Sequence, residues 1–272
     1  MKFSRICSAI WLLIALILLP IAAHAEIGTA VDVDPFARVG SATLVSGARL
    51  SAGDVIQTSG QGQAQILFDD NTRIVVGPNS RFVISDIQMG SSNSANRFAV
   101  DAVRGSFRFI SGRSPKNAFR ISTPHATIGV RGTIFDLNVA GQTQLASLRG
   151  IVEMCGSSAC VTLRARCSVA IAERGGSVRT PTSVSEAGQI IRSGFPYIED
   201  QRPRLLPAFR SPVRSCARYE VPRRGIGQNE EGGRFETERD DPEEPDEDRG
   251  DEGDDEDDGG DDDGGDDDYF DY

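Results

Sequence analysis

The chain has 272 residues and a formal net charge of −11, with 39% hydrophobic and 25% charged residues. It contains two histidines, His24 and His125, which excludes a catalytic or metal site that needs several imidazole groups. The charge is divided unevenly along the sequence. Residues 229–272 hold 25 acidic and three basic side chains, a net of −22, whereas residues 1–228 hold 26 basic and 15 acidic ones, a net of +11.

The first 25 residues have the pattern of a cleaved secretory signal peptide. Lys2 and Arg5 provide a positive start, residues 10–19 form an uninterrupted apolar run, and small residues follow at the position that a signal peptidase reads. The alternative, an uncleaved membrane anchor, needs about 20 apolar residues, and Pro20 interrupts the run. We therefore expect a mature chain that begins at Glu26, lies in the periplasm or outside the cell, and does not span the membrane.

Residues 26–180 are predicted to form an all-β domain. Apolar side chains recur at every second position in short segments, and polar or glycine-containing turns such as 69–71 and 77–80 separate these segments. No stretch after residue 25 shows the 3.6-residue apolar stripe that is typical of a helix. The pattern favours antiparallel strands arranged as a sandwich, a barrel or a solenoid. The segments are Ala64/Ile66/Phe68, Ile74/Val76, Phe82/Ile84, Phe98/Val100, Phe107/Phe109, Phe119/Ile121, Ile128/Val130 and Phe135/Leu137/Val139.

Three similar tripeptides connect successive alternating segments. They are Val103-Arg104-Gly105, Val130-Arg131-Gly132 and Leu148-Arg149-Gly150. Glycine at such a junction permits a positive φ angle or a bulge where a strand bends. We interpret the three tripeptides as corners of the β-domain, with their arginines on the surface.

Residues 181–228, called the strap below, and residues 229–272 differ from the β-domain in composition. Proline recurs through the strap and arginine is dense. Apolar side chains at 194–198 and at Leu205-Leu206 suit packing against the β-domain, but a poorly ordered linker explains the same composition equally well. Residues 229–272 are predicted to be disordered, because like charges repel and too few apolar side chains offset the conformational entropy.

Four cysteines follow the predicted signal peptide. Cys155 and Cys160 lie at the two ends of a predicted hairpin, within reach of the separation of about 3.5–4.5 Å between β-carbons that a disulfide requires. An oxidising compartment favours this bond, and the remaining pair, Cys167 and Cys216, would then staple the strap to the domain. Four cysteines allow three pairings, so the sequence leaves the connectivity open. A zinc site is disfavoured because exported thiols usually oxidise.

No enzymatic activity is expected, and we identify no catalytic or cofactor-binding residue. After signal cleavage, His125 would be the remaining histidine, so a Ser-His-Asp arrangement or a histidine metal site would depend on it alone. His125 follows Thr123-Pro124, which favours an exposed turn. A single histidine in such a turn is therefore not evidence for a catalytic or metal site.

The acidic segment also contains candidate calcium ligands. Calcium is held by six to eight oxygen atoms, which Asp- and Gly-rich loops supply. The run lacks the fixed carboxylate spacing of a folded calcium loop, so diffuse and weak cation binding is the expected behaviour. The weak candidates are Asp257, Asp258, Asp261, Asp262 and Asp263.

Five short motifs follow one another between residues 50 and 153, and together they resemble a known family. They are Leu50-x-x-Gly53-Asp54-x-Ile56-x-Thr58, the segment 64–72, the turn Pro78-Asn79-Ser80, the stretch from Phe119-x-Ile121-x-Thr123-Pro124 to Val130-Arg131-Gly132-Thr133-x-Phe135, and Leu148-x-Gly150-x-Val152. In this order they resemble the FecR domain, a periplasmic β-module of bacterial regulators. Asn71 stands where this family usually has glycine.

The resemblance implies a scaffold and not an active site, because the matching residues belong to turns and corners. In iron-uptake signalling, such a regulator also has a cytoplasmic helical region that holds a sigma factor, joined to the β-module by a membrane helix. Here the β-domain follows only the predicted signal peptide. We therefore expect a freestanding envelope form that does not bind a sigma factor directly.

Taken together, these patterns predict an exported binding or sensing module that recognises a partner or ligand in periplasmic or envelope signalling. The alternative is a structural or surface protein whose Asp/Gly-rich tail binds calcium or mediates assembly. A nucleic-acid partner is not expected outside the cytoplasm. The arginines of residues 1–228 would suit surface contact with anionic lipid or polysaccharide.

Overall fold

The computed structural model describes residues 25–198, 200–213 and 215–216, all of which belong to the first of two units of the chain, Met1–Arg224. The predicted signal peptide, the predicted disordered tail and the five calcium candidates lie outside the described residues. None of the helices in the described ranges has the length and apolar character needed to cross a bilayer.

Strands dominate the described residues, and the prediction of an all-β fold is confirmed. The strands are β1 (Glu26–Val33), β2 (Ala37–Val39), β3 (Ala42–Thr43), β4 (Arg49–Ser51), β5 (Val55–Thr58), β6 (Ala64–Phe68), β7 (Arg73–Val76), β8 (Arg81–Met89), β9 (Ala95–Ile110), β10 (Phe119–Ser122), β11 (Thr127–Val139), β12 (Thr143–Cys155), β13 (Cys160–Leu163), β14 (Val169–Ala172) and β15 (Val178–Arg179). The helical elements are α2 (Val184–Gly194), α3 (Gln201–Arg204) and the short 3₁₀ turns η1 (Lys116–Ala118) and η2 (Pro207–Phe209).

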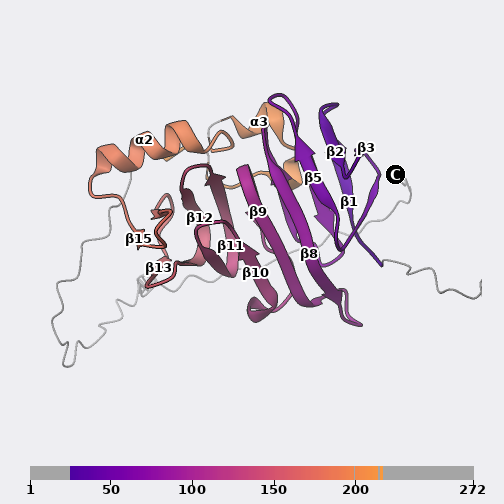
Figure 1. Ribbon diagram of the computed structural model, residues 1–272, viewed down its shortest axis with the longest axis horizontal. Helices are drawn as coiled ribbons and strands as arrows, with labels where there is room; N and C mark the ends of the chain where they lie inside the picture. The colour runs from indigo at the N-terminus through magenta and orange to yellow at the C-terminus, as the bar shows by residue number, and fades with distance from the viewer. Residues whose placement is uncertain (1–24, 199, 214, 217–272) are drawn as a thin grey trace, which may run out of the picture. The chain divides into compact units, whose positions relative to one another are not determined.

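The strands form one open sheet (Figure 1). Its main path runs β15-β14-β12-β11-β10-β9-β7-β6-β1-β4, while β8 joins β9 to β5, and β13 pairs with β12. All pairs are antiparallel except β9 with β10, where Phe119 lies opposite Phe98 in parallel register. Residues 111–118 carry the chain back to the start of β9 before β10 begins, and such a return connection is what parallel pairing requires.

Alternating side chains of these strands fill the main core. Every apolar residue of the segments predicted from the period-2 pattern is buried there. Phenylalanine rings make its centre: Phe109 stacks on Phe135 with ring centroids 5.1 Å apart, and Phe68 meets Phe98 edge-on at 5.0 Å. Each such pair contributes about 0.5–1.5 kcal/mol beyond the burial of apolar area.

The three predicted corners bend the three longest strands, β9, β11 and β12. Gly105, Gly132 and Gly150 all have positive φ angles, of 102°, 61° and 80°. At each corner the parity of the core-facing residues changes. In β9, for example, Phe98 and Val100 face the main core before the corner, and Phe107 and Phe109 face it afterwards. The corner arginines Arg104, Arg131 and Arg149 are exposed, as the sequence predicted.

The absence of helix after residue 25 was a wrong prediction, because the strap contains α2. The helix begins at Ser183, whose hydroxyl accepts the N–H of Glu186 at 3.1 Å. The Glu186 carboxylate in turn accepts the N–H of Thr182 at 2.7 Å. Serine followed three residues later by glutamate is a recognised helix start. The apolar stripe is hard to recognise because the helix has only 11 residues, and its five buried residues include just two large apolar side chains, Ile190 and Ile191.

The strap covers the face of the sheet opposite the main core. From α2 and the residues after it, Ile191, Phe195 and Ile198 pack against Leu148 of β12 and Ile171 of β14. Farther along, Tyr197, Leu205 and Phe209 pack against Val75 of β7. Both helices lie along the same side of the strands, at the top of Figure 1. Phe195, Tyr197, Ile198 and Leu205 are buried, whereas Pro196 and Leu206 are exposed.

Two disulfides join the four described cysteines. Cys155 is bonded to Cys160 across the β12–β13 hairpin, where the two residues are paired in register. Cys167 is bonded to Cys216, which ties the strap to the residues that precede β14. The first bridge closes a sequence separation of 5 residues and the second one of 49.

The two bridges are predicted to stabilise the fold unequally. The entropy that a disulfide removes from the unfolded chain grows with the loop it closes, which gives about 2 kcal/mol for the hairpin bridge and about 4 kcal/mol for the strap bridge. Replacing Cys167 and Cys216 by serine should therefore lower the free energy of unfolding more than replacing Cys155 and Cys160 does. Urea denaturation of the two double variants measures this, and equal losses would contradict the prediction.

The cap of α2 predicts a dependence on pH. Hydrogen bonds from the Thr182 N–H, the Arg179 guanidinium and the Thr182 hydroxyl lower the pKa of Glu186 from 4.5 to about 2. A lowered folded-state pKa contributes stability above about pH 4.5, and this contribution is lost as the pH falls towards 2. Glu186→Gln should cost about 1 kcal/mol at pH 7 and little at pH 2.5, measured by urea denaturation. Glu153→Gln is the matched control, because Glu153 is an exposed glutamate on β12. A loss of stability in Glu186→Gln that does not change with pH would contradict the role of the Glu186 carboxylate in the cap.

Candidate functional site

The turn Gly77–Ser80 is held rigidly between β7 and β8. The Thr58 hydroxyl donates to the carbonyl oxygen of Gly77 and accepts the N–H of Ser80 at 2.9 Å. Asn79 has a φ angle of 53°, a left-handed conformation that asparagine tolerates, and its N–H donates to the loop after β5 at 2.9 Å. The motif residues Thr58, Pro78, Asn79 and Ser80 therefore build one structural unit.

The first corner packs against this turn at a distance that only glycine permits. A β-carbon on Gly105 would lie 2.0 Å from the hydroxyl oxygen of Ser80. The same hydroxyl oxygen accepts the N–H of Ser106 at 3.1 Å. The tight contact fixes the backbone on both sides of Gly105 and places the exposed Arg104 beside the turn.

Two surface pockets, called the arginine pockets below, meet at Arg104. The smaller has a volume of about 420 Å³ and the larger one of about 610 Å³. The smaller pocket is lined by Phe36, Arg38, Thr43, Gln57 and Arg104, among others. The larger is lined by Asn79, Arg104, Ser106, Asn138, Arg192 and Ser193, among others. The second pocket thus combines the sheet with the last turn of α2.

The arginine pockets carry positive charge that no ion pair with another described residue neutralises. Arg38, Arg104 and Arg192 are exposed, and no acidic side chain lines either pocket. Within the described part of the chain, these three side chains form no ion pair. Guanidinium groups remain protonated at any physiological pH and bind carboxylates or phosphates through two parallel hydrogen bonds.

A third pocket of about 460 Å³ lies on the other side of Pro78 and has a different character. Asp32, Asp34 and Arg204 line it. Burial, together with the charge of Asp32, raises the pKa of Asp34 above its usual value, while Arg204 acts in the opposite direction. The carboxylates make this third pocket unsuited to an anion.

A buried ion pair holds the strap next to the arginine pockets. The guanidinium of Arg108 on β9 is completely buried and forms two hydrogen bonds, of 2.7 and 2.8 Å, with the Asp136 carboxylate on β11. It also donates to the side-chain oxygen of Gln201 at 2.9 Å and to the backbone carbonyl of Tyr197 at 2.8 Å. The Tyr197 ring lies 5.8 Å from the guanidinium carbon, a cation–π contact. We call these four residues the arginine lock.

Gln201 extends the arginine lock to the end of the described strap. Its side-chain oxygen accepts the N–H of Ser211 at 2.7 Å, and its side-chain nitrogen donates to the carbonyl of Val213 at 2.9 Å. Burial raises the pKa of Asp136, and Arg108 opposes that rise through its charge and hydrogen bonds. The paired guanidinium therefore favours the ionised form of the Asp136 carboxylate, against the larger effect of burial.

The Tyr197 side chain reaches from the strap to the turn. Its hydroxyl is buried and has no hydrogen-bond partner among the described residues. A β-carbon on Gly77 would lie 2.5 Å from this hydroxyl. Burial raises the pKa of Tyr197 far above its usual value, so the phenol stays neutral. The contact links the strap directly to the turn whose residues Pro78 and Asn79 line the larger arginine pocket.

The other motif residues shape turns away from these pockets. Gly53 has a φ angle of 93°, and the Asp54 carboxylate accepts the N–H of Ser51 at 2.8 Å. The Thr123 hydroxyl accepts the N–H of Ala126 at 3.0 Å, which closes the turn that contains Pro124. Asn71, the departure from the family pattern, has a φ angle of 66°, so asparagine here takes the conformation that glycine usually provides.

The second and third corners pack on each other. A β-carbon on Gly150 would lie 2.2 Å from the carbonyl oxygen of Gly132. The N–H of Thr133 donates to the Ser111 hydroxyl at 2.9 Å. Phe135 enters the main core, and Arg131 remains exposed. These residues therefore have structural positions, and the structure does not bring them to the arginine pockets.

His125 lies in the Thr123–Ala126 turn and is partly buried. Its Nδ1 atom lies 3.0 Å from the hydroxyl of Thr143, which donates to the hydroxyl of Thr123 at 2.9 Å. The imidazole of His125 thus contacts the first of two threonine hydroxyl groups that are hydrogen-bonded to each other. The arrangement positions a turn and contains no carboxylate to orient the imidazole as a base.

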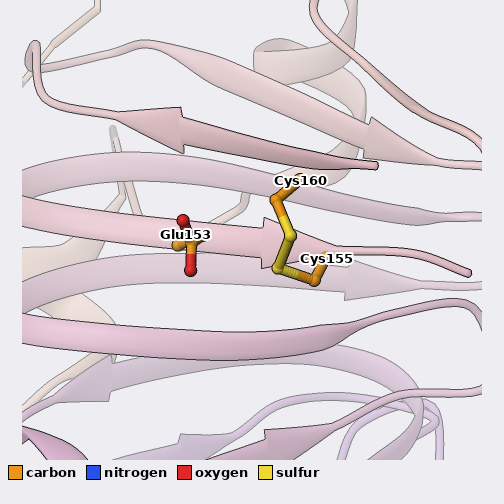
Figure 2. Close-up of side chains that lie close together, drawn as sticks. All are labelled: Glu153, Cys155 and Cys160. Carbon is orange, nitrogen blue, oxygen red and sulfur yellow. A yellow bond between two sulfur atoms is a disulfide. The ribbon is translucent and has the colours of Figure 1, made fainter. Parts of the chain in front are cut away.

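Glu153, Cys155 and Cys160 lie close together on β12 and β13, as Figure 2 shows. Such a group resembles a metal-binding set in composition. However, the two sulfur atoms are bonded to each other, and a disulfide sulfur is not the thiolate that binds zinc. Glu153 alone does not provide a metal site.

Sequence reasoning did not identify the arginine lock or the roles of Arg38 and Arg192. Arg108 lies between Phe107 and Phe109, where alternation predicts an outward side chain in solvent. One signal in the sequence could have indicated the ion pair. Arg108 and Asp136 each stand between two apolar residues of a predicted strand, in Phe107-Arg108-Phe109 and Phe135-Asp136-Leu137. The strap that buries this pair comes much later in the chain.

The arginine lock is predicted to contribute strongly to stability. Asp136→Asn leaves the Arg108 guanidinium buried without its counter-charge and should lower the free energy of unfolding by about 3–5 kcal/mol. The exposed pair Arg97–Asp86, at 3.1 Å, provides the control, because Asp86→Asn should cost no more than about 1 kcal/mol. Urea denaturation measures both. Replacing both partners, as Arg108→Met with Asp136→Leu, should cost less than Asp136→Asn, and similar losses from Asp136→Asn and Asp86→Asn would contradict the prediction.

Comparison with known proteins identifies the β-domain. Residues 54–153 match the family model described as FecR protein. No curated protein matches the chain. Two crystal structures of a protein from Parabacteroides distasonis, assigned as an anti-sigma factor and solved at 1.65 and 2.50 Å, share 15% identity with this chain, each with a TM-score of 0.39.

The similarity to these structures is partial. The alignments cover 47% and 52% of this chain, and 58% and 64% of the other. Less than two thirds of the length of those proteins is thus represented here. The family match, by contrast, falls on the segment whose turn and corner motifs carry the resemblance, from the Gly53-Asp54 turn to the strand after Gly150. Residues 54–153 are therefore similar to the FecR family, and this match is confined to that segment of the chain.

Proposed function

We propose that this chain is a binding and sensing module of extracytoplasmic regulation that recognises a partner through the face formed by the arginine pockets. A FecR-family domain fits a role in signalling. The proposal goes further by assigning recognition to one face of the domain, where the Gly77–Ser80 turn, the first corner and the end of α2 meet.

One observation carries the proposal: the two pockets share Arg104, whose charge has no partner among the described residues. Some exposed arginines of this domain pair with a neighbouring carboxylate, as Arg49 does with Glu26 at 3.0 Å, whereas Arg104 does not and instead lines two pockets. Three arginines that form no ion pair with the described residues thus lie around a concave surface and leave their donors available to a ligand. Pockets of about 300–1,000 Å³ that contain a few convergent polar groups are typical of binding sites.

The chemistry of the pocket walls favours binding over catalysis. Arginine, amide and hydroxyl side chains line the arginine pockets, without carboxylate, imidazole or thiol groups. A general base needs a pKa near the working pH, which arginine and unactivated hydroxyl groups do not have. The side chains of the arginine pockets are therefore suited to binding a charged or polar partner and not to abstracting a proton from it.

Two disulfides support a location outside the cytoplasm. Cysteines in the cytosol are generally kept reduced, whereas bridges such as Cys167–Cys216 persist in the periplasm or outside the cell. The strap bridge also maintains the larger pocket, because its wall includes Arg192 and Ser193 of the strap. The oxidising environment thus supports the shape of the proposed recognition face.

Site-specific photocrosslinking in cells of the source organism tests the proposal. A photoreactive phenylalanine analogue is introduced at Thr43 of the smaller pocket, at Ser193 of the larger pocket, or at Thr162 on β13, which is exposed and lines neither pocket. We expect the same adduct from Thr43 and Ser193 and none from Thr162. Adducts of equal yield at all three positions, or at Thr162 alone, would reject the arginine pockets as the recognition face.

A further inference from the structure

We propose that the arginine pockets bind an extended peptide segment of a partner protein in which carboxylate side chains alternate with apolar ones. Arg104 would be the central anchor, with Arg192 on one side and Arg38 and Phe36 on the other. The inference rests on the proposed function and specifies the chemistry of the partner.

The charge of the partner follows from the pocket walls. Three guanidinium groups border the two pockets and no carboxylate lines them. An anion entering this surface meets only attractive charges, and each guanidinium offers a pair of donors that match the two oxygens of a carboxylate. The nearby carboxylates of Asp32 and Asp34 line the third pocket, which shares Pro78 with the larger arginine pocket, so the positive surface of the larger pocket ends at that residue.

The apolar part of the partner follows from two exposed side chains beside the smaller pocket. Phe36 is 52% exposed and Val45 is 58% exposed. The β2–β3 pairing, which joins Arg38 to Thr43, together with the hydrogen bond from the Leu44 N–H to the Ala37 carbonyl, places Val45 across from Phe36. An aromatic and an aliphatic side chain side by side favour contact with an apolar side chain, because covering both removes apolar area from water.

The extended form of the partner follows from the shared wall. Arg104 belongs to both pockets, so a ligand that fills both must pass across this side chain. A peptide has this shape, and its backbone supplies donors and acceptors for the amides of Asn79 and Gln57. A membrane surface would meet exposed side chains but would not enter two pockets of about 420 and 610 Å³. The observations therefore favour a peptide over a lipid surface.

The larger pocket is ready for such a ligand before binding. Arg192 and Ser193 are at the end of α2, and Ile190 and Ile191 beside them are packed on the sheet. The arginine lock at Tyr197 and the Cys167–Cys216 bridge hold the strap on the sheet after this position. A preformed wall lowers the entropy cost of binding, because less chain must be ordered when the ligand arrives.

Fluorescence anisotropy with synthetic peptides tests the chemistry. The probe is a fluorescein-labelled decapeptide of alternating aspartate and phenylalanine, titrated with the full chain. A decapeptide of alternating asparagine and phenylalanine tests charge, and a decapeptide of aspartate alone tests the apolar contact. We expect binding of the first peptide to be at least about tenfold tighter than that of the neutral one, since charged hydrogen bonds are worth about tenfold or more each, and to weaken as salt is raised.

The chain provides a matched control for the central residue. Arg104 and Arg131 occupy equivalent places in two valine-arginine-glycine corners, and both are exposed, but only Arg104 lines the arginine pockets. Arg104→Gln should weaken binding of the acidic peptide about tenfold, and Arg131→Gln should change it less than twofold. Phe36→Ser should weaken the aspartate–phenylalanine peptide and leave the all-aspartate peptide unchanged. Every variant has the same residues 229–272, so competition from these acidic residues is equal throughout.

Several results would overturn the inference. Equal losses from Arg104→Gln and Arg131→Gln would show attraction by net charge alone, and equal binding of the neutral peptide would remove the role of the carboxylates. Phosphatidylglycerol vesicles or polygalacturonate that bind in an Arg104-dependent way, with no binding of the peptide, would identify lipid or polysaccharide instead. Circular dichroism confirms that each variant is folded.

The same variants separate this inference from the proposed function. A Ser193 crosslink that persists unchanged in Arg104→Gln would leave the recognition face in place and reject acidic chemistry. Binding of the acidic peptide without any partner crosslink in cells would support the chemistry and reject the cellular role. A Ser193 crosslink that disappears in Arg104→Gln, but not in Arg131→Gln, supports both.

Discussion

The completely buried guanidinium of Arg108 connects the two parts of this fold. Moving an arginine and an aspartate out of water costs several kcal/mol for each ion, and the structure offsets that cost with geometry. Asp136 meets the guanidinium through two hydrogen bonds, and Gln201 and the Tyr197 carbonyl satisfy further donors. Because two of these partners belong to the strap, the charge on the sheet is compensated fully only when the strap is in place. The interaction therefore selects one position of the strap among those that apolar packing alone would allow.

Close backbone contacts at glycine residues determine the shape of the sheet. Three long strands bend at glycines, and each bend changes which side chains face the core, so one strand contributes to two parts of the sheet. At the first bend, the contact of Gly105 with Ser80 leaves no room for a β-carbon. This contact places Arg104 where the turn, the sheet and the strap meet. The central position of Arg104 in the recognition face that we propose is thus a consequence of backbone geometry, and Arg38 and Arg192 add their charges on its two sides.

Local patterns in the sequence were sufficient to predict most of the β-domain, but they did not locate the site. Alternation identified the core segments because each strand has one face in the main core, and the three glycine corners were recognisable because positive φ angles favour glycine. Arg108 was missed because its burial depends on residues 89 and 93 positions later, Tyr197 and Gln201. Likewise, Arg104 and Arg131 look the same in sequence, and only the packing of Ser80 and α2 distinguishes their surroundings. The helix α2 was missed although its Ser183–Glu186 cap was readable, because its apolar face is too short to show a period.

The order of the segments that form the arginine pockets has a consequence for how the protein matures. The residues named for the smaller pocket all precede or include Arg104, whereas the larger pocket needs Arg192 and Ser193, and Cys216 must be present before the strap bridge can close. A ribosome produces the chain from its N-terminus, so one half of the recognition face is encoded within the first 104 residues and the other half arrives after roughly twice that length. The larger pocket can therefore form only once residue 193 has been made, and the bridge that holds its wall only once residue 216 has been made.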